Sequence, residues 1–336
     1  MPKIIIIGAT TWGTTLSIAL GNAGYNVNLL TRSKTEASMI ENERENQKLL
    51  PGFKLPSNVT INHLPKDCLD DADMLVFAVP SRRIRENAKN IVKHVNASTI
   101  ITSASKGLES NSGKRISQVI DEEFKSIGLK NPVCALSGPN LALEIASGNP
   151  ALSVLACTEI ETAQKAQSLI SSSKFRVYAN DDLIGVELGG ALKNIIAIGS
   201  GICDGLEFGV NAKAAFIARG LSEIARLGVS AGAKPITFSG LAGMGDLIAT
   251  CSSNLSRNHT VGTLLSKGAS LNEILSSMNH VAEGIDTTKA ALGLSRKLNV
   301  EMPITEGIYS IIFDNKPINE AIDELMARNP QLENWV

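Results

Sequence analysis

The sequence lacks an excess of charge of either sign. It carries 32 Lys and Arg residues against 33 Asp and Glu residues, and neither sign forms a long run. Proteins that bind nucleic acid or a membrane surface through charge usually show a basic patch or stripe. We therefore expect no nucleic-acid partner and no stable membrane association, and a small polar molecule is the favoured partner.

The sequence is also poor in the features of exported and metal-binding proteins. No segment offers about 18 uninterrupted apolar residues, and the N-terminus shows no signal-peptide pattern. The four histidines show no ligand spacing, and the five cysteines lie far apart without a C-x-x-C pair. These absences predict a cytoplasmic protein without a metal site. The cysteines are expected to be reduced and mostly buried, namely Cys68, Cys134, Cys157, Cys203 and Cys251.

The first half of the chain contains short apolar or β-branched runs with helical patterns between them, such as 12–24 and 81–95. Most runs are apolar throughout rather than alternating, which is typical of strands covered on both faces of a parallel sheet. This alternation predicts an α/β domain over residues 1–182, a Rossmann-like, doubly wound and mostly parallel sheet. The predicted strands are 4–7, 26–30, 74–79, 99–102, 133–136 and 152–156.

After the segment FRVYAND, at 175–181, the strand pattern gives way to long helical patterns. With 336 residues that are 43% hydrophobic, the chain is long enough for two domains. We predict a second, all-helical domain over 183–336, with helices at 184–206, 211–228, 262–268, 284–299 and 304–315. Six glycines are expected to stop or start these helices, namely Gly205, Gly209, Gly228, Gly262, Gly284 and Gly307.

The glycine-rich loop GATTWG, at 8–13, follows the first predicted strand and opens a helix. Loops of the form G-x-G-x-x-G at this place bind a pyrophosphate at the helix N-terminus. Gly8 supplies the tight turn and Gly13 allows close packing, but Thr10 stands where the middle glycine is usual. We predict a dinucleotide site whose backbone path admits Thr10, so that Thr10→Gly keeps or tightens cofactor binding. A strand-to-helix turn that binds nothing is the alternative.

The second predicted strand ends in Thr31-Arg32-Ser33, where a carboxylate would hold an adenine ribose in many NAD-binding proteins. Arg32 suits a 2′-phosphate and can also stack on adenine, so the residues allow NADP without excluding NAD. A solvated arginine at a strand end is the alternative. Ser33, which is not a second basic residue, weakens the case for strict NADP preference.

Four further stretches combine polar residues with permissive backbone. They are SASKGLE at 103–109, LSGPNLALE at 136–144, ELGGALKNIIAIGSGICDGL at 187–206 and GLAGMGDLIATCSSNLSRNHTVG at 240–262. The first two follow the ends of predicted strands, where ligands of open α/β sheets bind.

Taken with the loop and with the segment from Val281 to Phe313, this set resembles the soluble bacterial type of NAD(P)-dependent glycerol-3-phosphate dehydrogenase over nearly the whole chain. The most specific parts are GALKN, GLAGMGDL and TCSSNLSRN. The resemblance implies reversible hydride transfer between NAD(P)H and dihydroxyacetone phosphate, giving sn-glycerol 3-phosphate for phospholipid synthesis. It also implies a homodimer.

The resemblance implies that Lys193 is the catalytic acid and base. A ketone reduced by hydride needs a proton donor at its oxygen, and an enclosed lysine near other cations can have a lowered pKa. Lys106 is implied to contact the substrate and the cofactor and to polarise the carbonyl. Asp246 would bind substrate hydroxyls or orient Lys193.

The resemblance also assigns binding residues. Ser256, Arg257 and Asn258 would hold the substrate phosphate at a helix start, and Gly138 and Asn140 would line the substrate. Asn140 departs from the usual serine and is expected to alter fit more than chemistry. Further cofactor contacts are implied for Thr11, Trp12, Arg32, Lys106, Ala142, Arg257 and Glu283.

Each assignment has a structural alternative. Lys193 could extend from an apolar helix to the surface, Lys106 could be a surface lysine, and Asp246 and Ser256 could cap helices. At the level of the whole protein, the alternatives are a dehydrogenase of another hydroxy compound, and a protein that senses NAD(H) or triose phosphate without turning it over.

Overall fold

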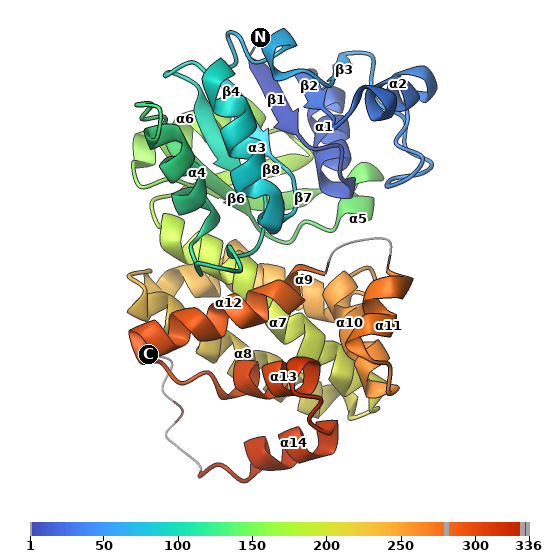
Figure 1. Cartoon of the computed structure of the whole chain (residues 1–336), viewed down its shortest axis with the longest axis vertical. Coiled ribbons are helices and arrows are strands. Elements are labelled where there is room, and N and C mark those ends of the chain that lie inside the picture. Colours follow the sequence, from blue (N-terminus) through green and yellow to red (C-terminus); the bar gives the residue numbers. More distant parts are fainter. Residues whose placement is uncertain (1, 279–281, 330–332, 334–336) are drawn as a thin grey trace. The chain divides into compact units, whose positions relative to one another are not determined.

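The computed structural model describes residues 2–278, 282–329 and 333. It contains two compact units (Figure 1). The sheet unit comprises the chain up to Ser105 together with Ile116–Leu183, and the helical unit comprises Lys106–Arg115 and the chain from Ile184 onward. The predicted fold class, a doubly wound sheet followed by a helical part, is confirmed. The placement of residues 106–115 with the helical unit was not anticipated from the sequence.

The sheet has eight strands in the order β3-β2-β1-β4-β5-β6-β7-β8. Neighbouring strands are parallel except β6 and β7, which are antiparallel. Since β2 and β4 flank β1, the direction of winding reverses there, which is where open α/β sheets bind ligands. The strands are β1 Lys3–Ile7, β2 Asn26–Leu30, β3 Val59–Asn62, β4 Met74–Phe77, β5 Ile100–Ser103, β6 Val133–Ser137, β7 Ala151–Ala156 and β8 Phe175–Asn180.

Helices cover both faces of this sheet, which explains the continuous apolar runs. Along β1, Ile4 and Ile6 belong to one apolar cluster and Ile5 and Ile7 to another, because successive side chains point to opposite faces. The first cluster includes side chains from α1 (Thr11–Asn22), α2 (Lys34–Glu43), α5 (Ala142–Ala146) and α6 (Ile160–Ile170). The second includes those of α3 (Ile84–Ile91) and α4 (Ile116–Lys125).

All six predicted strands are present, with small differences at their ends. The two strands that were not predicted, β3 and β8, are the edges of the sheet. Buried and exposed residues alternate at the start of β8, and β3 is a short segment with only one buried residue. Edge strands of this kind lack the continuous apolar pattern from which the central strands were predicted.

The helical unit is built around α7, whose bounds are Leu183–Gly205. This helix is long and apolar enough to cross a membrane, but 89% of its most apolar window is buried inside the protein, as in a core helix. The other helices are α8 Gly209–Ser230, α9 Asp246–Ser252, α10 Arg257–Ser266, α11 Leu271–Ser277, α12 Glu283–Leu298, α13 Pro303–Phe313 and α14 Ile318–Met326.

Three of the six glycines do not stop or start a helix, so that part of the prediction was wrong. Gly228, Gly262 and Gly307 lie inside helices. A Cβ at Gly262 would lie 1.9 Å from the carbonyl oxygen of Ile198, and one at Gly228 would lie 2.1 Å from the ring of Phe238. These two glycines permit close helix packing, whereas a Cβ at Gly307 would make ordinary contact at 3.6 Å.

All five cysteines are buried thiols, as predicted. Among the residues that the structure describes, no group of three or more His, Cys, Asp or Glu side chains could hold a metal ion.

Candidate active site

Three residues that the sequence analysis named as catalytic meet in the helical unit. Lys193 comes from the middle of α7, Asp246 begins α9, and Lys106 begins the segment that the chain contributes from between β5 and α4. The two oxygens of Asp246 bind one lysine each: Nζ of Lys193 lies 2.5 Å from Oδ1, and Nζ of Lys106 lies 2.7 Å from Oδ2. One carboxylate therefore orients two ammonium groups.

This cluster is nearly closed to solvent. The side chains of Asp246 and Lys193 are 1% and 7% exposed, and that of Lys106 is 18% exposed. Lys193 does not extend to the surface, so the structural alternative for this lysine is excluded. Buried charges are stable only when they are paired and hydrogen-bonded, and Asp246 supplies that pairing to both lysines.

Thr250 completes the surroundings of Lys193 and was not identified from the sequence. Its hydroxyl accepts a hydrogen bond from Nζ of Lys193 and donates one to the backbone carbonyl of Asp246. The two residues lie four positions apart on α9, so they share a face of the helix. That spacing, DLIAT, is the signal that could have pointed to Thr250.

A chain of amides joins the cluster to the start of α10. Asn194 donates from Nδ2 to the carbonyl oxygen of Lys106 at 3.2 Å, and its Oδ1 accepts from Nδ2 of Asn258 at 2.9 Å. Asn258 in turn accepts from the backbone N–H of Gly284. Within this chain of amides, Nδ2 of Asn258 uses one of its two N–H bonds, and the second is not used there.

The remaining residues predicted for the substrate phosphate, and Glu283, which was predicted for the cofactor, lie at the starts of two helices. Ser256 caps α10 by accepting from the N–H of His259, so its structural alternative is observed. Arg257 is the first residue of α10 and is exposed, and Glu283 is the first residue of α12. A helix N-terminus that presents N–H groups beside an arginine is suited to an anion.

The proton affinity of Lys106 is lowered by its surroundings. Burial lowers the pKa of Lys106 to about 8, with Asp246 opposing this effect and the charge of Lys193 adding to it. An ammonium group with a pKa in this range can both stabilise negative charge and exchange a proton near neutral pH.

The GATTWG loop lies in the sheet unit, between β1 and α1. Gly8 has φ of 104°, in the region that favours glycine, and a Cβ at Gly13 would lie 2.0 Å from the carbonyl oxygen of Gly8. Both glycines therefore have the roles predicted for them. Thr11 and Trp12 are the first residues of α1, where backbone N–H groups have no partner within the helix.

The side chain of Thr10 holds the loop in place. Its backbone is extended, and its Oγ1 caps α1 by accepting from the N–H of Gly13 at 3.0 Å. The same hydroxyl donates to the carbonyl oxygen of Ala78, just beyond β4, at 2.7 Å. Since its proton is already donated, Thr10 fixes the loop rather than offering its proton to a phosphate.

Asn46 also holds this loop and was not found from the sequence. Its side chain is buried, and Nδ2 donates to the carbonyl oxygen of Ala9 and to Oγ1 of Thr14. A rigid turn with free N–H groups at the start of α1 fits the pyrophosphate of a dinucleotide.

Arg32 lies at the end of β2 with its side chain 75% exposed. Glu36, in the first turn of α2, lies 3.5 Å from its guanidinium and accepts from its backbone N–H. A carboxylate is thus present beside Arg32, although the sequence around Arg32 did not reveal it. A carboxylate suits a ribose hydroxyl, whereas an arginine suits a 2′-phosphate.

The segment after β6 contains the other predicted residues of the sheet unit. Gly138 has φ of 136° and lies so close to β7 that a Cβ would be 3.0 Å from the carbonyl oxygen of Leu152. Oδ1 of Asn140 accepts from the hydroxyl of Ser153, while its buried Nδ2 has no partner among the described residues. Ala142 begins α5, and its carbonyl oxygen accepts from Thr15.

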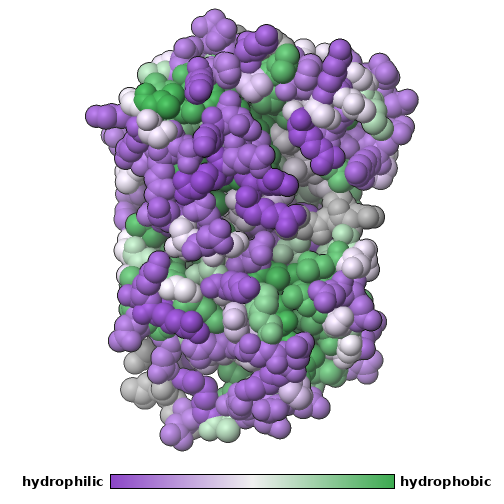
Figure 2. Space-filling model, viewed as in Figure 1, coloured by the Kyte–Doolittle hydropathy of each residue, from purple (hydrophilic) through white to green (hydrophobic). Residues whose placement is uncertain are grey.

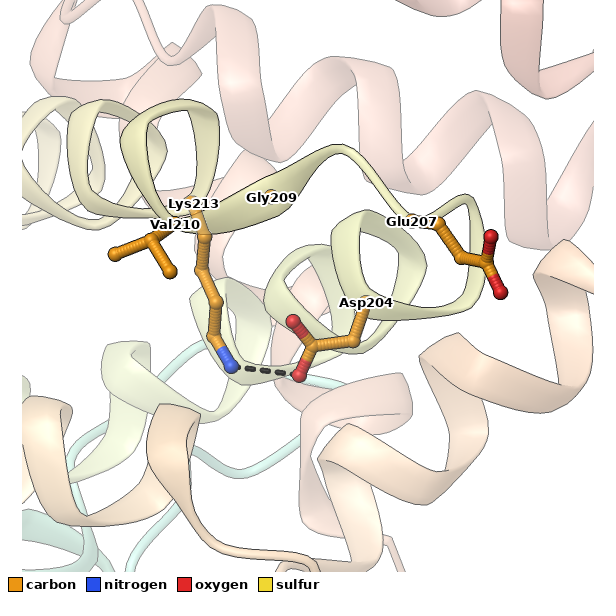
Figure 3. Close-up of a pocket in the computed structure, with 5 residues that line it drawn as sticks. All are labelled: Asp204, Glu207, Gly209, Val210 and Lys213. Carbon is orange, nitrogen blue, oxygen red and sulfur yellow. Dashed lines mark hydrogen bonds and ion pairs between the residues drawn. The ribbon is translucent and has the colours of Figure 1, made fainter.

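A pocket of about 410 Å³ lies elsewhere in the helical unit, at the turn between α7 and α8 (Figure 3). Asp204 and Lys213 point toward each other across it, 2.6 Å apart, while Glu207 points away. Asp204 also binds Nε2 of His259 at 2.7 Å. This pocket contains none of the residues predicted for the site.

Taken together, the sheet and the cluster define a class of protein. A doubly wound sheet with a glycine-rich loop at its switch point is typical of proteins that bind dinucleotides. Two ammonium groups on one buried carboxylate can stabilise and protonate a developing alkoxide. These are the features of a dinucleotide-dependent dehydrogenase.

Comparison with known proteins gives the family. Residues 3–163 match the model of the NAD-dependent glycerol-3-phosphate dehydrogenase N-terminus, and residues 182–323 match that of the C-terminus. The chain therefore belongs to the NAD-dependent glycerol-3-phosphate dehydrogenase family.

Individual relatives agree over nearly the full length. The glycerol-3-phosphate dehydrogenase [NAD(P)+] of Dehalococcoides mccartyi strain 195 is 50% identical over 97% of this chain and 91% of its own length. That of Chlorobium limicola is 44% identical over 98% of this chain and 99% of its own. The crystal structure of the enzyme from Coxiella burnetii superposes with a TM-score of 0.91 at 34% identity, covering 97% of this chain and 99% of that one.

Proposed function

We propose that this chain reversibly reduces dihydroxyacetone phosphate to sn-glycerol 3-phosphate with NADH or NADPH, the reaction for which its relatives are named. The observation that carries the proposal is the pair of lysines on Asp246, at 2.5 and 2.7 Å. A ketone that accepts hydride becomes an alkoxide, and the pair provides both the positive charge and the proton that the alkoxide requires.

Lys193 is proposed as the proton donor. Asp246 and Thr250 hold its Nζ from two sides, which fixes the direction of the remaining N–H bond. A proton held in a fixed direction reaches the substrate oxygen without reorganisation of the site, which is the main advantage of a preorganised donor. In the reverse reaction the neutral amine would take up the proton of the alcohol.

Lys106 is proposed to bind the carbonyl oxygen from a second side. Its pKa of about 8 keeps the ammonium form dominant at neutral pH. Asn194 fixes the backbone of Lys106 through its carbonyl oxygen, so the side chain starts from a defined position. Lys106 is also proposed to contact the cofactor.

The sheet unit is proposed to hold the cofactor, and the nicotinamide supplies the hydride when it is bound. The N–H groups at the start of α1 would bind the pyrophosphate, and Arg32 would contact the adenosine end. The residues proposed for this role are Gly8, Thr10, Thr11, Trp12, Gly13, Arg32 and Ala142.

The substrate phosphate is proposed to bind at the start of α10. Arg257 is exposed there, Ser256 has a hydroxyl proton to donate, and Asn258 has an N–H group outside the amide chain. Gly138 and Asn140 are proposed to line the substrate. The buried, unpartnered Nδ2 of Asn140 supports this role, because a buried donor normally has an acceptor.

The test is oxidation of NADH and of NADPH by the purified protein, dependent on dihydroxyacetone phosphate, beside Lys193→Ala. Removal of the proton donor is expected to lower turnover by about a hundredfold or more. Lys213→Ala is the matched control, because Lys213 also binds a carboxylate but lies at the pocket between α7 and α8. A Lys193→Ala variant as active as Lys213→Ala would contradict the assignment of Lys193.

Three broader assignments follow from the same function. We propose that the enzyme is cytoplasmic, that its product supplies phospholipid synthesis, and that it is a homodimer. Large apolar side chains exposed on the helical unit support association, among them Val210 at 83% and Ile236 at 75%. Figure 2, viewed as Figure 1, shows hydrophobic surface over the helical unit. Light scattering of the purified protein tests the dimer, and a mass of one chain would rule it out.

A further inference from the structure

The segment Lys106–Arg115, here termed the arm, lies in a different unit from the chain before and after it. The chain on either side lies in the sheet unit, while the arm itself belongs to the helical unit. Its first residue is one of the two lysines bound to Asp246. The position of Lys106 therefore depends on how the arm is attached.

The arm is a small hairpin whose two ends are tied together. Leu108 and Arg115 form an antiparallel bridge, and the N–H of Glu109 donates to the carbonyl oxygen of Lys114 at 3.0 Å. Leu108 is fully buried in the apolar core of the helical unit. Because of the bridge, a displacement of Arg115 would be transmitted to Leu108 and so to Lys106.

Helix α7 binds the arm at both ends. Arg115 lies 2.5 Å from Glu187, with the two side chains 17% and 6% exposed. Asn194 binds the carbonyl oxygen of Lys106. Glu187 and Asn194 are seven residues apart, about two helical turns, so they lie on the same face of α7 at a spacing of about 10 Å.

We propose that Arg115 and Glu187 are positioning residues that set the place of Lys106 beside Asp246. The proposal rests on the proposed role of Lys106 in binding the substrate carbonyl. Neither residue is required to touch the reacting atoms. The buried ion pair fixes the end of the arm remote from Lys106, Leu108 fixes its middle and Asn194 fixes its start, so Lys106 is held against one helix.

The experiment compares Arg115→Ala, Arg115→Lys and Lys106→Ala in kinetics with varied dihydroxyacetone phosphate. Loss of positioning is expected to lower kcat/KM by roughly tenfold to a hundredfold, as small displacements of catalytic groups do. KM for dihydroxyacetone phosphate should rise more than KM for NADH. Arg115→Lys, which keeps the charge, should recover part of the loss. Arg328→Ala, which removes an exposed ion pair with Glu301, is the matched control.

A second measurement separates positioning from simple loss of folded protein. Burial lowers the pKa of Lys106. A loosened arm that lets water reach this lysine should therefore raise its pKa and shift the alkaline limb of the pH profile to higher pH. A variant that is only partly folded would show a lower kcat with both KM values and the pH profile unchanged. If Arg115→Ala does not fold, Glu187→Gln gives the same comparison with a smaller change.

The outcomes distinguish the two proposals. If Lys106→Ala is impaired while Arg115→Ala and Glu187→Gln both keep the KM values and the pH profile of the parent, the positioning role is wrong and the role of Lys106 stands. If Lys106→Ala is unimpaired, the proposed role of Lys106 fails, and the positioning role fails with it.

Discussion

Two carboxylates of the helical unit each bind two nitrogen groups, and they differ mainly in burial. Asp246 binds Lys193 and Lys106 with its side chain 1% exposed, and Asp204 binds Lys213 and His259 with its side chain 39% exposed. Burial alone would raise the pKa of Asp204, but the hydrogen bonds from Lys213 and His259 outweigh it and lower the pKa. The same contact pattern therefore occurs in two very different environments.

The two carboxylates share a contact pattern, so our assignment of the proposed site to Asp246 depends on its burial rather than on the pattern alone. Water screens charges near a surface, whereas the interaction of buried charges is strong and their isolation is costly. Around Asp246, little solvent reaches the second ammonium group, that of Lys106, to screen its charge, because this side chain is only 18% exposed. That excess positive charge is what a developing alkoxide would neutralise, and the cluster at Asp204 has no comparable need for a ligand.

The largest expected effect comes from removing the buried carboxylate. Asp246→Asn keeps the shape but leaves two buried ammonium groups without a counter-ion, which is expected to lower the free energy of unfolding by about 3–5 kcal/mol. Since both lysines lose their orientation, kcat/KM should fall by about a hundredfold or more. Urea unfolding and steady-state kinetics measure the two effects. Activity within about threefold of the parent would show that Asp246 does not organise the lysines.

The next effect concerns pH. Lys106 has a lowered pKa of about 8, whereas the same group in the unfolded chain has the ordinary value of 10.5. Ketone reduction should therefore decline above about pH 8, by about tenfold per pH unit once this lysine is neutral. Folding stability should change in the opposite sense, because the unfolded chain binds more protons between these two values and stability rises with pH there.

The pH profile of kcat/KM for dihydroxyacetone phosphate checks this prediction, with Lys106→Arg as the comparison. An arginine stays charged over the whole range, so its alkaline limb should disappear even if its rate is low. An unchanged limb in that variant would assign the titration to another group.

The central sheet could be predicted from the sequence because its physical cause is local. Strands covered on both faces are apolar throughout, and six such runs were found. The edge strands β3 and β8 escaped because one of their faces is not buried in the same way. Gly228 and Gly262 were misinterpreted as helix ends, since a glycine needed for close packing looks the same in sequence as one needed for a turn.

The candidate site divides in the same manner. Lys193 and Asp246 could be predicted as site residues, because each lies in a specific motif. The attachment of the arm and the meeting of Lys106 with Lys193 depend on contacts between residues far apart in the chain, 88 positions in the case of Asn194 and Lys106. No local pattern reports such contacts.

Thr10 extends the comparison of the two carboxylates to an uncharged group, because its hydroxyl also bonds two partners. Thr10→Val keeps the shape and removes both hydrogen bonds, which is expected to cost about 1–2 kcal/mol of unfolding free energy. Thr10→Gly loses the same cap but is expected to cost only a few tenths of a kcal/mol, and cofactor binding should be kept or tightened. Urea unfolding and titration with NADH measure both.

A large loss of NADH affinity in Thr10→Gly would mean that the side chain of Thr10, and not only its backbone, contacts the cofactor. If Thr10→Val alone lost affinity, the cap would be required to hold the N–H groups of α1 in place. Ser168→Ala is a suitable control, since its hydroxyl also bonds to helix backbone, at Lys165 of α6, and touches no residue of the loop.

The smallest effect on activity is expected at Asp204, and it tests the comparison most directly. Asp204→Asn leaves Lys213 and His259 without their carboxylate, but solvent reaches Asp204, whose side chain is 39% exposed. Lys213 and His259 are only 20% and 7% exposed, but ion pairs whose carboxylate is reached by water contribute little, so the expected loss is roughly 0.5 kcal/mol of unfolding free energy, with kcat and KM unchanged. A loss as large as that of Asp246→Asn would show that burial is not what separates the two carboxylates. In that case the pairing with two nitrogen groups would itself be the source of the energy, and the assignment of the active site to Asp246 would rest on its two lysines alone.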